Sequence, residues 1–332
     1  MEKKLTIAIP AYNISKYIDN IINSIISVKN KMLLEVIIVN DGSKDDTIEK
    51  ANNYKNKYPE IIRVIDKENG GHGSTINAAI KEAKGKYFKV IDGDDWVDSS
   101  QLDLLLEHLD KIEDDMLVCS YTQVMDDGEI IKKIKDIPKG LEYDTTYQMG
   151  EVCSMVDSPY EFHRVYYKTE IYKKSKELDE NCFYVDIEYI FFPLKNVKSV
   201  RFLNYNIYMY RLGRDGQSVS LDSYIKNKSN LGTVLNGLCE FVHEEKLKDN
   251  IREYIIKRID TFVATIATVY LLMNDKKEAN NFYKKIIEDC KKKYPDIFNK
   301  LNSKKYKIST SFNYNFYYLK RTIVKITGKL KL

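Results

Sequence analysis

The stretch that decides the fold is Tyr87-Phe88-Lys89-Val90-Ile91-Asp92-Gly93-Asp94-Asp95. Its first five residues form a short, mostly apolar run, which predicts a buried strand. Three carboxylates follow within the next four positions. Carboxylates packed this closely repel one another unless a cation lies among them, and hard divalent cations favour oxygen ligands. The stretch therefore predicts a metal site at a strand end, and an acidic turn built from ordinary turn residues is the alternative.

Upstream of this stretch the chain alternates strand and helix patterns. Continuous apolar runs predict buried strands at residues 5–9, 36–39 and 61–65. Apolar residues at helical spacing predict helices at residues 14–26 and about 74–83. Ser15 is a candidate cap for the first helix, and Ser43 with Asp46 forms a capping signature for a helix that follows the second strand.

This alternation predicts an α/β fold with a Rossmann-like, mostly parallel sheet flanked by helices. The loops that follow parallel strands meet at one edge of the sheet, and open α/β sheets bind their ligands at that edge. We therefore expect the three carboxylates to share a site with the loops after the first three strands.

The pattern of the remaining chain is mixed at first and then helical. It predicts a helix at residues 102–109, a strand at 116–124 and a charged hairpin or loop region at 126–147. Residues 222–300 have helical periodicity, with one apolar stripe that we interpret as core packing. The expected organisation is a domain at 1–220 with a nucleotide-binding half (1–100) and an acceptor half (101–220), a helical region at 221–300 and a basic amphipathic tail at 301–332.

Composition limits the class of protein. The net charge of +4 is small against 53 basic and 49 acidic residues, which argues against nucleic acid as a partner. The five cysteines are scattered and form no CxxC pair, so neither a disulfide framework nor structural zinc is expected. The N-terminus lacks a signal-peptide pattern, and the longest apolar stretch, 261–273, is too short to span a bilayer. We expect a soluble, cytoplasmic protein.

Four strings in order resemble the motifs of family 2 glycosyltransferases, which are inverting enzymes with the GT-A fold. They cover roughly the first 100 residues, and each lies at a predicted strand end. They are Ile9-Pro10-Ala11-Tyr12-Asn13, Val39-Asn40-Asp41-Gly42-Ser43, Asn69-Gly70-Gly71 with Asn77, and Asp92-Gly93-Asp94-Asp95.

The resemblance implies a role for each matching residue in binding a nucleotide-sugar donor, most simply a UDP-sugar. Asp41 would accept a hydrogen bond from the base or ribose, and Asp92 would approach the ribose or the metal. Asp94 and Asp95 would hold Mg²⁺ or Mn²⁺ on the diphosphate, where the cation neutralises the charge that develops on the leaving group. The other residues implied in donor binding are Pro10, Ala11, Tyr12, Asn13, Gly70, Gly71, His72 and Asn77.

The glycine-rich loop departs from the family pattern at one position. Ile76 stands where family members often carry Arg before the Asn, so a phosphate contact must come from elsewhere, for example from His72 or a Lys. We expect the glycines of this loop to let the backbone approach the donor closely, because they carry no side chain. A surface or packing role for His72 is the alternative.

Inverting transfer requires a carboxylate base that removes the proton from the acceptor hydroxyl. In the family this base is usually the Asp of a Glu-Asp pair, and here Val185 precedes Asp186 in place of the Glu. Asp186 is the expected base, and Glu188 is the second candidate or an acceptor ligand. Helix capping by both carboxylates is the alternative.

Downstream segments resemble the part of the family that closes over the donor. Tyr210-Arg211 and the following Arg214-Asp215-Gly216-Gln217 supply Arg211 and Gln217 as candidate partners of the diphosphate or acceptor, and a plain surface loop is the alternative. His163 and Arg164 are candidates for the border of the acceptor cleft.

The C-terminal tail has no acidic residue after Asp296 and many lysines. Its apolar residues recur at spacings of three and four, so a helix there would be amphipathic. A basic amphipathic helix suits an anionic membrane surface. Docking on the helical region or pairing with a second subunit is the alternative.

The expected function is metal-dependent, inverting transfer of a hexosyl or N-acetylhexosaminyl group from a nucleotide donor. The acceptor would be a hydroxyl of a glycan or lipid-linked glycan in surface-polysaccharide synthesis, at the inner face of the cell membrane. A sugar nucleotidyltransferase and a non-catalytic glycan-binding scaffold are the alternatives.

Overall fold

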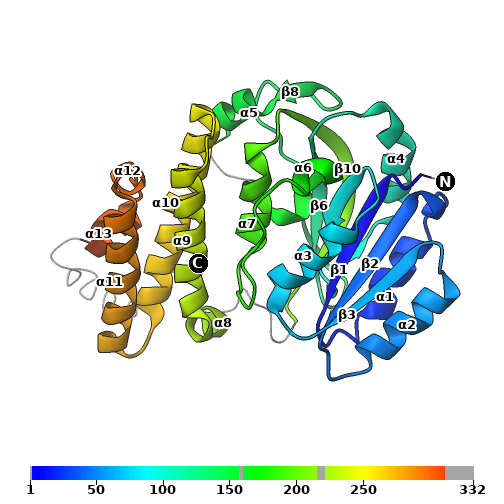
Figure 1. Ribbon diagram of the computed structural model, residues 1–332, viewed down its shortest axis with the longest axis horizontal. Coiled ribbons are helices and arrows are strands. Elements are labelled where there is room, and N and C mark those ends of the chain that lie inside the picture. The colour runs from blue at the N-terminus through cyan, green and yellow to red at the C-terminus, as the bar shows by residue number, and fades with distance from the viewer. Residues whose placement is uncertain (1, 157–159, 215–220, 311–332) are drawn as a thin grey trace. The chain divides into compact units, whose positions relative to one another are not determined.

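The computed structural model describes residues 2–156, 160–214 and 221–310 (Figure 1). The chain divides into two compact units, residues 1–155 with 160–215 and residues 156–159 with 216–332. The described part of the first unit holds the sheet, and the described part of the second unit is helical. Gln217 and the tail residues 311–332 lie outside the described residues.

The described strands form one ten-stranded mixed sheet, in the order β3-β2-β1-β4-β9-β6-β10-β5, with β7 paired to β6 and β8 paired to β10. The strands are β1 Leu5–Ala11, β2 Leu34–Asp41, β3 Ile62–Lys67, β4 Tyr87–Val90, β5 Trp96–Val97, β6 Met116–Met125, β7 Ile130–Ile134, β8 Thr146–Gln148, β9 Val165–Lys168 and β10 Ser199–Leu212.

The helices of the first unit lie between these strands. They are α1 Ile18–Ile26, α2 Thr47–Lys57, α3 Gly71–Glu82, α4 Ser99–His108, α5 Met149–Met155, α6 Thr169–Tyr172 and α7 Asp186–Phe191. Four short 3₁₀ helices also occur there, η1 Lys31–Leu33, η2 Leu109–Lys111, η3 Phe162–Arg164 and η4 Phe192–Lys195.

The first four strands are parallel, as their continuous apolar sequences predict. β1 pairs with β2 and β4, and β2 pairs with β3, all in the parallel sense. Every residue of β2 is buried, because helices cover both faces of the sheet. Right-handed crossovers place α1 and α2 on one face and α3 on the other, since the chain reverses direction across the sheet after β3. Figure 1 shows α3 lying across the strands.

The second half of the sheet is not purely parallel. β9 pairs antiparallel with both β4 and β6, and β10 then runs parallel to β6. Two reversals return β10 to the direction of β1 and β4. The C-terminal end of β10 therefore reaches the same sheet edge as the three carboxylates.

The two predicted serine caps are wrong. α1 begins at Ile18 after Tyr17, without a side-chain cap, and the backbone N–H of Ser15 instead donates to Asp45, 3.1 Å away. α2 begins at Thr47, and the hydroxyl of Ser43 accepts from the backbone N–H of Asn13 at 3.0 Å. The polar groups that we read as caps instead join the loops after β1 and β2, because those loops are adjacent at the sheet edge.

The described part of the second unit is built on α10. Its helices are α8 Leu221–Lys226, α9 Lys228–Glu244, α10 Asp249–Leu272, α11 Lys276–Lys293, α12 Pro295–Phe298 and α13 Lys304–Thr310. α10 packs against α9, α11 and α13, and its apolar stripe is buried, which confirms the core-packing interpretation. Among the described helices, none is both long and apolar enough to cross a membrane.

Candidate functional site

The predicted site residues come together at the sheet edge formed by the ends of β1, β2, β4 and β10. Gly93 makes this possible for the carboxylate loop. A Cβ atom at Gly93 would lie 2.5 Å from Ile14 and 2.7 Å from the carbonyl oxygen of Pro10. A side chain at this position would therefore push the loop after β4 away from the loop after β1.

The loop after β1 exposes two side chains, those of Tyr12 and Asn13. Tyr12 is 49% exposed. Ala11 has no exposed surface, so it presents no atom to a ligand. Asn13 has a φ of 53° and its side chain accepts a hydrogen bond from the backbone N–H of Lys44 at 2.8 Å. Pro10 is partly exposed. Tyr12 is therefore the candidate in this loop for stacking on a base.

The Asp41 carboxylate shapes the glycine loop. It is buried and accepts hydrogen bonds from the backbone N–H groups of Gly70 at 2.9 Å and Gly71 at 2.8 Å. The Lys67 ammonium is 2.9 Å from the same carboxylate. Asp41 therefore ties the end of β2 to the glycine loop, and its expected bond to the nucleotide stays a prediction.

The glycines of the loop admit protein backbone. A Cβ atom at Gly73 would lie 2.2 Å from the carbonyl oxygen of Asp179, and one at Gly71 would lie 3.2 Å from Cα of Asn181. We expected close approach of the donor at these positions. The structure instead places there the segment that precedes α7, so the glycines control how closely α3 approaches that segment.

Asn77 fixes the same contact. Its side-chain amide donates to the carbonyl oxygen of Leu178 at 2.9 Å, and its side-chain oxygen accepts from the N–H of Leu178 at 3.0 Å. The residue is 3% exposed, so the expectation that Asn77 contacts the donor is not supported. Both ends of its amide are used to hold the segment that leads to Asp186.

His72 lies at the centre of the acidic groups. Its Nε2 is 3.0 Å from Oδ1 of Asp92, and about one-third of each side chain is exposed. Burial lowers the pKa of His72, but the hydrogen bond to Asp92 and the negative charges of Asp92, Asp186 and Asp94 outweigh burial and raise it. Burial acts to raise the pKa of Asp92, but the hydrogen bond to His72 and the charge of His72 outweigh burial and lower it. His72 therefore connects the carboxylate loop electrostatically to α7.

Asp94 and Asp95 point to different surroundings. Asp94 pairs with the guanidinium of Arg214 and keeps 14% of its side-chain surface exposed. Burial and the neighbouring charge of Asp92 raise the pKa of Asp94. Asp95 is 1% exposed and accepts hydrogen bonds from the Tyr208 hydroxyl at 2.6 Å and the Arg211 N–H at 2.7 Å. Asp95 thus anchors the loop to β10, which is not the metal-ligand position that the sequence suggested.

Arg211 also supports this loop. Its Nε donates to the carbonyl oxygen of Asp94 at 2.7 Å, and its guanidinium lies over the ring of Trp96 at 4.7 Å and pairs with Asp126. We expected Arg211 to pair with a diphosphate. In this arrangement Arg214 is the arginine that pairs with the partly exposed carboxylate of Asp94.

Asp186 and Glu188 face opposite ways. They are two residues apart on a helix, which turns them about 200° from each other. Asp186 is partly exposed and its charge reaches His72. Glu188 has no exposed surface, and its Oε2 accepts from the N–H of Asp179 at 2.9 Å. A side chain with no accessible surface cannot contact an acceptor, so Glu188 is corrected to a buried structural carboxyl.

Of the two residues expected at the acceptor border, Arg164 is buried. It donates to the carbonyl oxygens of Cys119 at 3.0 Å and Asp136 at 2.7 Å. The ring of His163 lies in an aromatic cluster, 4.9 Å from Tyr121 and 4.1 Å from Tyr210. Burial lowers the pKa of His163 to about 3, so the ring is neutral.

Sequence reasoning missed Tyr208 and Lys89. The Lys89 ammonium is fully buried, donates to the carbonyl oxygen of Phe162 at 2.8 Å, and lies 5.1 Å from the ring centre of Tyr208. Burial lowers the pKa of Lys89 to about 7. The available signal was a lysine inside an apolar strand, whereas nothing in the sequence distinguishes Tyr208 among 26 tyrosines.

The carboxylates fit a divalent cation as a pair. In the described part of the chain no three His, Cys, Asp or Glu side chains form a metal-binding group. Asp92 and Asp94 keep part of their side-chain surface exposed. Burial raises the pKa of Asp94 most and the negative charge of Asp92 raises it further, and a cation beside both carboxylates would offset that charge. One or two carboxylates with substrate phosphates are a usual ligand set for Mg²⁺. The residues present therefore suit a cation that is shared with a diphosphate.

Comparison with known proteins gives the same family. A family model described as Glycosyl transferase family 2 matches residues 6–180. The uncharacterized glycosyltransferase EpsJ of Bacillus subtilis (strain 168) is 28% identical over 215 residues, which cover 62% of this chain and 60% of EpsJ. The chain thus spans less than two thirds of the length of the curated relatives it matches.

Two solved structures share the fold. S. aureus TarS 1–349 in complex with UDP-GlcNAc matches with a TM-score of 0.67 and 18% identity, covering 99% of this chain and 93% of that one. The mannosyltransferase PcManGT from Pyrobaculum calidifontis, in complex with GDP-Man and Mn²⁺, matches with a TM-score of 0.53 and 13% identity, covering 99% and 89%. The expected GT-A fold with C-terminal helices is confirmed.

Proposed function

The chain belongs to glycosyl transferase family 2, and we propose that it transfers a sugar from a nucleotide donor to a hydroxyl group with inversion. The observation that carries this proposal is the arrangement around His72. Asp92 lies 3.0 Å from its ring, and the charges of Asp94 and Asp186 act on the same ring. The proposed donor-binding carboxylates, Asp92 and Asp94, and the proposed base, Asp186, therefore all act electrostatically on one residue.

The donor is proposed to be a UDP-sugar that carries a hexosyl or N-acetylhexosaminyl group. The exposed ring of Tyr12 would stack on the base, with Pro10 beside it. Asp41 and the backbone of Gly70 and Gly71 would act by holding the loop shape. TarS binds UDP-GlcNAc on this fold, which supports a uridine nucleotide for this chain.

We propose Asp92 and Asp94 as the residues that would hold Mn²⁺ or Mg²⁺. When bound, such a cation stabilises the negative charge of the departing diphosphate. Arg214 lies beside Asp94 and supplies positive charge at the same place. His72 would add a second partner for the diphosphate, in the absence of the Arg that Ile76 replaces.

Asp186 is proposed as the base that accepts the proton from the acceptor hydroxyl as this oxygen attacks the anomeric carbon. It is the accessible carboxylate of α7, and Asn77 and Gly73 hold the preceding segment against α3. The position of Asp186 relative to His72 thus depends on the packing of α3.

The acceptor is proposed to be a glycan or lipid-linked glycan of a surface polysaccharide. TarS is a poly(ribitol-phosphate) beta-N-acetylglucosaminyltransferase, which supports a polymeric surface acceptor. We propose that the protein works in the cytoplasm, at the inner face of the cell membrane, and that its basic tail binds there. Gln217 is proposed as a partner of the diphosphate or acceptor, and pairing with a second subunit is the alternative role of the tail.

The test is release of UDP from a panel of UDP-sugars, with and without Mn²⁺. Asp94→Asn is expected to weaken metal-dependent donor turnover at least about tenfold, and Asp186→Asn to lower turnover about 10²-fold or more while donor binding persists. Asp110→Asn, at an exposed carboxylate that pairs with Lys4, is the matched control. If no nucleotide-sugar binds, or if Asp94→Asn and Asp186→Asn behave like the control, the proposal is wrong.

A further inference from the structure

Tyr208 of β10 holds both ends of the turn that carries the carboxylates. Its hydroxyl donates to Oδ2 of Asp95 at 2.6 Å and accepts from the backbone N–H of Asp92 at 3.2 Å. A backbone hydrogen bond of 3.0 Å, from the N–H of Asp95 to the carbonyl oxygen of Asp92, closes the same turn. One hydroxyl therefore ties the first residue of the turn to the last.

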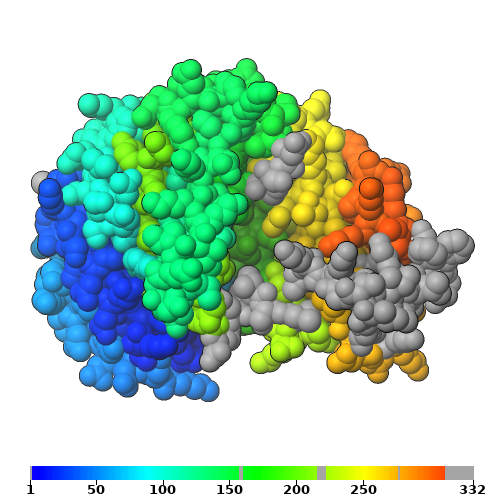
Figure 2. Space-filling model, turned by 180° about the vertical axis from the view of Figure 1, so that it is seen from behind, coloured from blue at the N-terminus to red at the C-terminus, as the bar shows by residue number. Residues whose placement is uncertain are grey.

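The main chain of β10 is held on both sides of Tyr208. On one side Tyr208 lies opposite Val97 of β5, and on the other it lies opposite Tyr121 of β6. The carbonyl oxygen of Ile207 accepts from the N–H of Asp98 at 2.8 Å. Figure 2 shows part of β10 as a narrow yellow-green strip between cyan and green surfaces. The hydroxyl of Tyr208 is therefore carried by a strand that neighbours hold in place.

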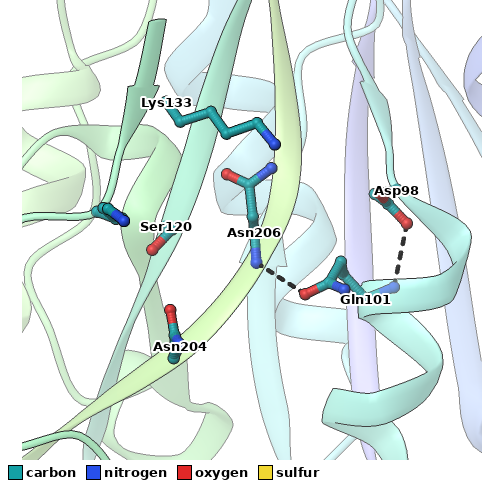
Figure 3. Close-up of a pocket in the computed structure, with 7 residues that line it drawn as sticks. Asp98, Gln101, Ser120, Lys133, Asn204 and Asn206 are labelled. Carbon is teal, nitrogen blue, oxygen red and sulfur yellow. Dashed lines mark hydrogen bonds between the residues drawn. The ribbon is translucent and has the colours of Figure 1, made fainter.

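A β-bulge lies directly before Tyr208. Asn206 pairs with Ser120, whereas Tyr208 pairs with Tyr121, so β10 holds one extra residue at this point. Bulges of this kind change the direction of a side chain and occur often beside active sites. The N–H of Asn206 donates to the side-chain oxygen of Gln101 on α4 at 3.2 Å (Figure 3). The bulge that precedes Tyr208 is therefore fixed by α4.

The ring of Tyr208 is packed independently of its hydroxyl. Tyr208 has no exposed surface, and the ring centre of His163 lies 4.8 Å from its own. The Lys89 ammonium lies 5.1 Å from the same ring centre and donates to the carbonyl oxygen of Phe162 at 2.8 Å. The substitution Tyr208→Phe therefore keeps the packed ring and removes only the hydroxyl that bridges the turn.

The turn has a buried part and an accessible part. Asp95, which the Tyr208 hydroxyl contacts, is 1% exposed. The side chains of Asp92 and Asp94 keep 32% and 14% of their surface exposed, and the carbonyl oxygen of Asp94 accepts from Nε of Arg211 at 2.7 Å. The buried contacts therefore hold the main chain of the turn, and two carboxylates of the turn stay accessible.

We propose that Tyr208 is a positioning residue for the divalent cation, because its hydroxyl fixes the turn from which Asp92 and Asp94 would hold that cation. This inference rests on the proposed function, in which the cation is shared with the donor diphosphate. Without the hydroxyl, the N–H of Asp92 and Oδ2 of Asp95 each lose a partner, and the turn can change its shape. Groups that orient metal ligands without touching the metal typically change metal affinity about 10–100-fold.

Binding of Mn²⁺ to the full-length protein tests this role. Mn²⁺ is titrated into the wild type and into Tyr208→Phe, and the free ion is measured by electron paramagnetic resonance. The titration is done without nucleotide and with one equivalent of UDP, against a blank that holds UDP alone. The wild type is expected to bind Mn²⁺ saturably, and Tyr208→Phe is expected to raise the Kd for Mn²⁺ about tenfold or more.

Tyr87 supplies the matched control. It also has no exposed surface, and its hydroxyl donates to the carbonyl oxygen of Asp114 at 2.8 Å. Tyr87 begins β4, whereas the carboxylates follow the other end of that strand. Tyr87→Phe therefore removes a buried, bonded hydroxyl far along the strand from the turn. It is expected to lower the melting temperature as Tyr208→Phe does, and to leave the Kd for Mn²⁺ unchanged.

Three outcomes would overturn the proposal. They are a wild type that binds no Mn²⁺ even with UDP, a Tyr208→Phe protein with the wild-type Kd for Mn²⁺, and an equal rise of this Kd in Tyr87→Phe. Failure of the proposed transfer activity is measured separately, by UDP release from nucleotide-sugars. A protein whose Mn²⁺ binding depends on Tyr208 but which releases no UDP from any donor would contradict the proposed function and leave this inference standing.

Discussion

The carboxyl group of Glu188 has no exposed surface, and its Oε1 has no hydrogen-bond partner in the part of the chain that the structure describes. Burial raises the pKa of Glu188 to about 8, although the hydrogen bond from the Asp179 N–H opposes this rise. The folded protein therefore holds a proton here that the unfolded chain releases near pH 4.3. As a result, the contribution of Glu188 to stability falls as the pH rises from about 4 to about 8.

Glu188→Gln removes the titrating proton and keeps an acceptor for the Asp179 N–H. We compare the free energy of unfolding of Glu188→Gln with that of the wild type, measured by denaturant unfolding at pH 5 and pH 8. The difference in favour of the variant is expected to be larger at pH 8 by about 1–3 kcal/mol. Glu170→Gln, at an exposed position on α6, is the control. An equal difference at both pH values would show that Glu188 is ionised in the folded protein.

The residue scale is also where sequence reasoning was least complete. The acidic string at 92–95 correctly drew attention to the sheet edge, but it treated its carboxylates as equivalent. Asp95 is turned toward Tyr208, and Asp94 toward Arg214. Both partners come from the end of β10 and the residues just after it, more than a hundred positions away, so no local pattern could separate the two roles.

At the scale of elements, α3 is packed against the segment before α7 through its glycines. The carbonyl oxygen of Asp179 occupies the place of a Cβ atom at Gly73, 2.2 Å away. The motif Asn69-Gly70-Gly71 with Asn77 was identified from sequence, but the partner of these residues was not. Helix–segment contacts of this kind depend on where the chain returns after a hundred residues.

Gly73→Ala is expected to separate α3 from this segment, because a methyl group cannot fit at 2.2 Å from a carbonyl oxygen. We expect a loss of stability of about 1–3 kcal/mol, together with loss of turnover as Asp186 moves away from His72. Thermal unfolding and UDP release measure the two effects. Ala78→Ser, at a partly exposed position on the same helix, is the control, and a Gly73→Ala enzyme with normal stability and turnover would refute the packing argument.

At the scale of the whole molecule, the first unit holds all the site residues that the structure describes, and the second unit is an independent helical core. The two compact units divide near residue 215. The domain boundary that the sequence places at residue 220 stays a prediction. The apolar stripe of α10 predicted the helical core, since its spacing depends only on the helix itself. The mixed half of the sheet could not be predicted, because short antiparallel strands carry weak local patterns.

The basic tail predicts attachment to an anionic membrane surface. Without residues 311–332, the protein is expected to lose its binding to vesicles that contain phosphatidylglycerol, because the tail lysines supply the attraction. Vesicle sedimentation at low and high salt measures the effect, with phosphatidylcholine vesicles as the control. Unchanged binding after truncation would assign the tail to another partner.

The sequence by itself determined the α/β class, the four strand ends that meet at one edge, the family and the identity of the carboxylates, because these follow from local apolar patterns and short motifs. Only the tertiary structure decided which carboxylate is accessible, which glycine faces protein instead of ligand, and that the charges of both Asp92 and Asp186 act on His72. The physical reason is that burial and hydrogen-bond partners are set by residues distant in sequence.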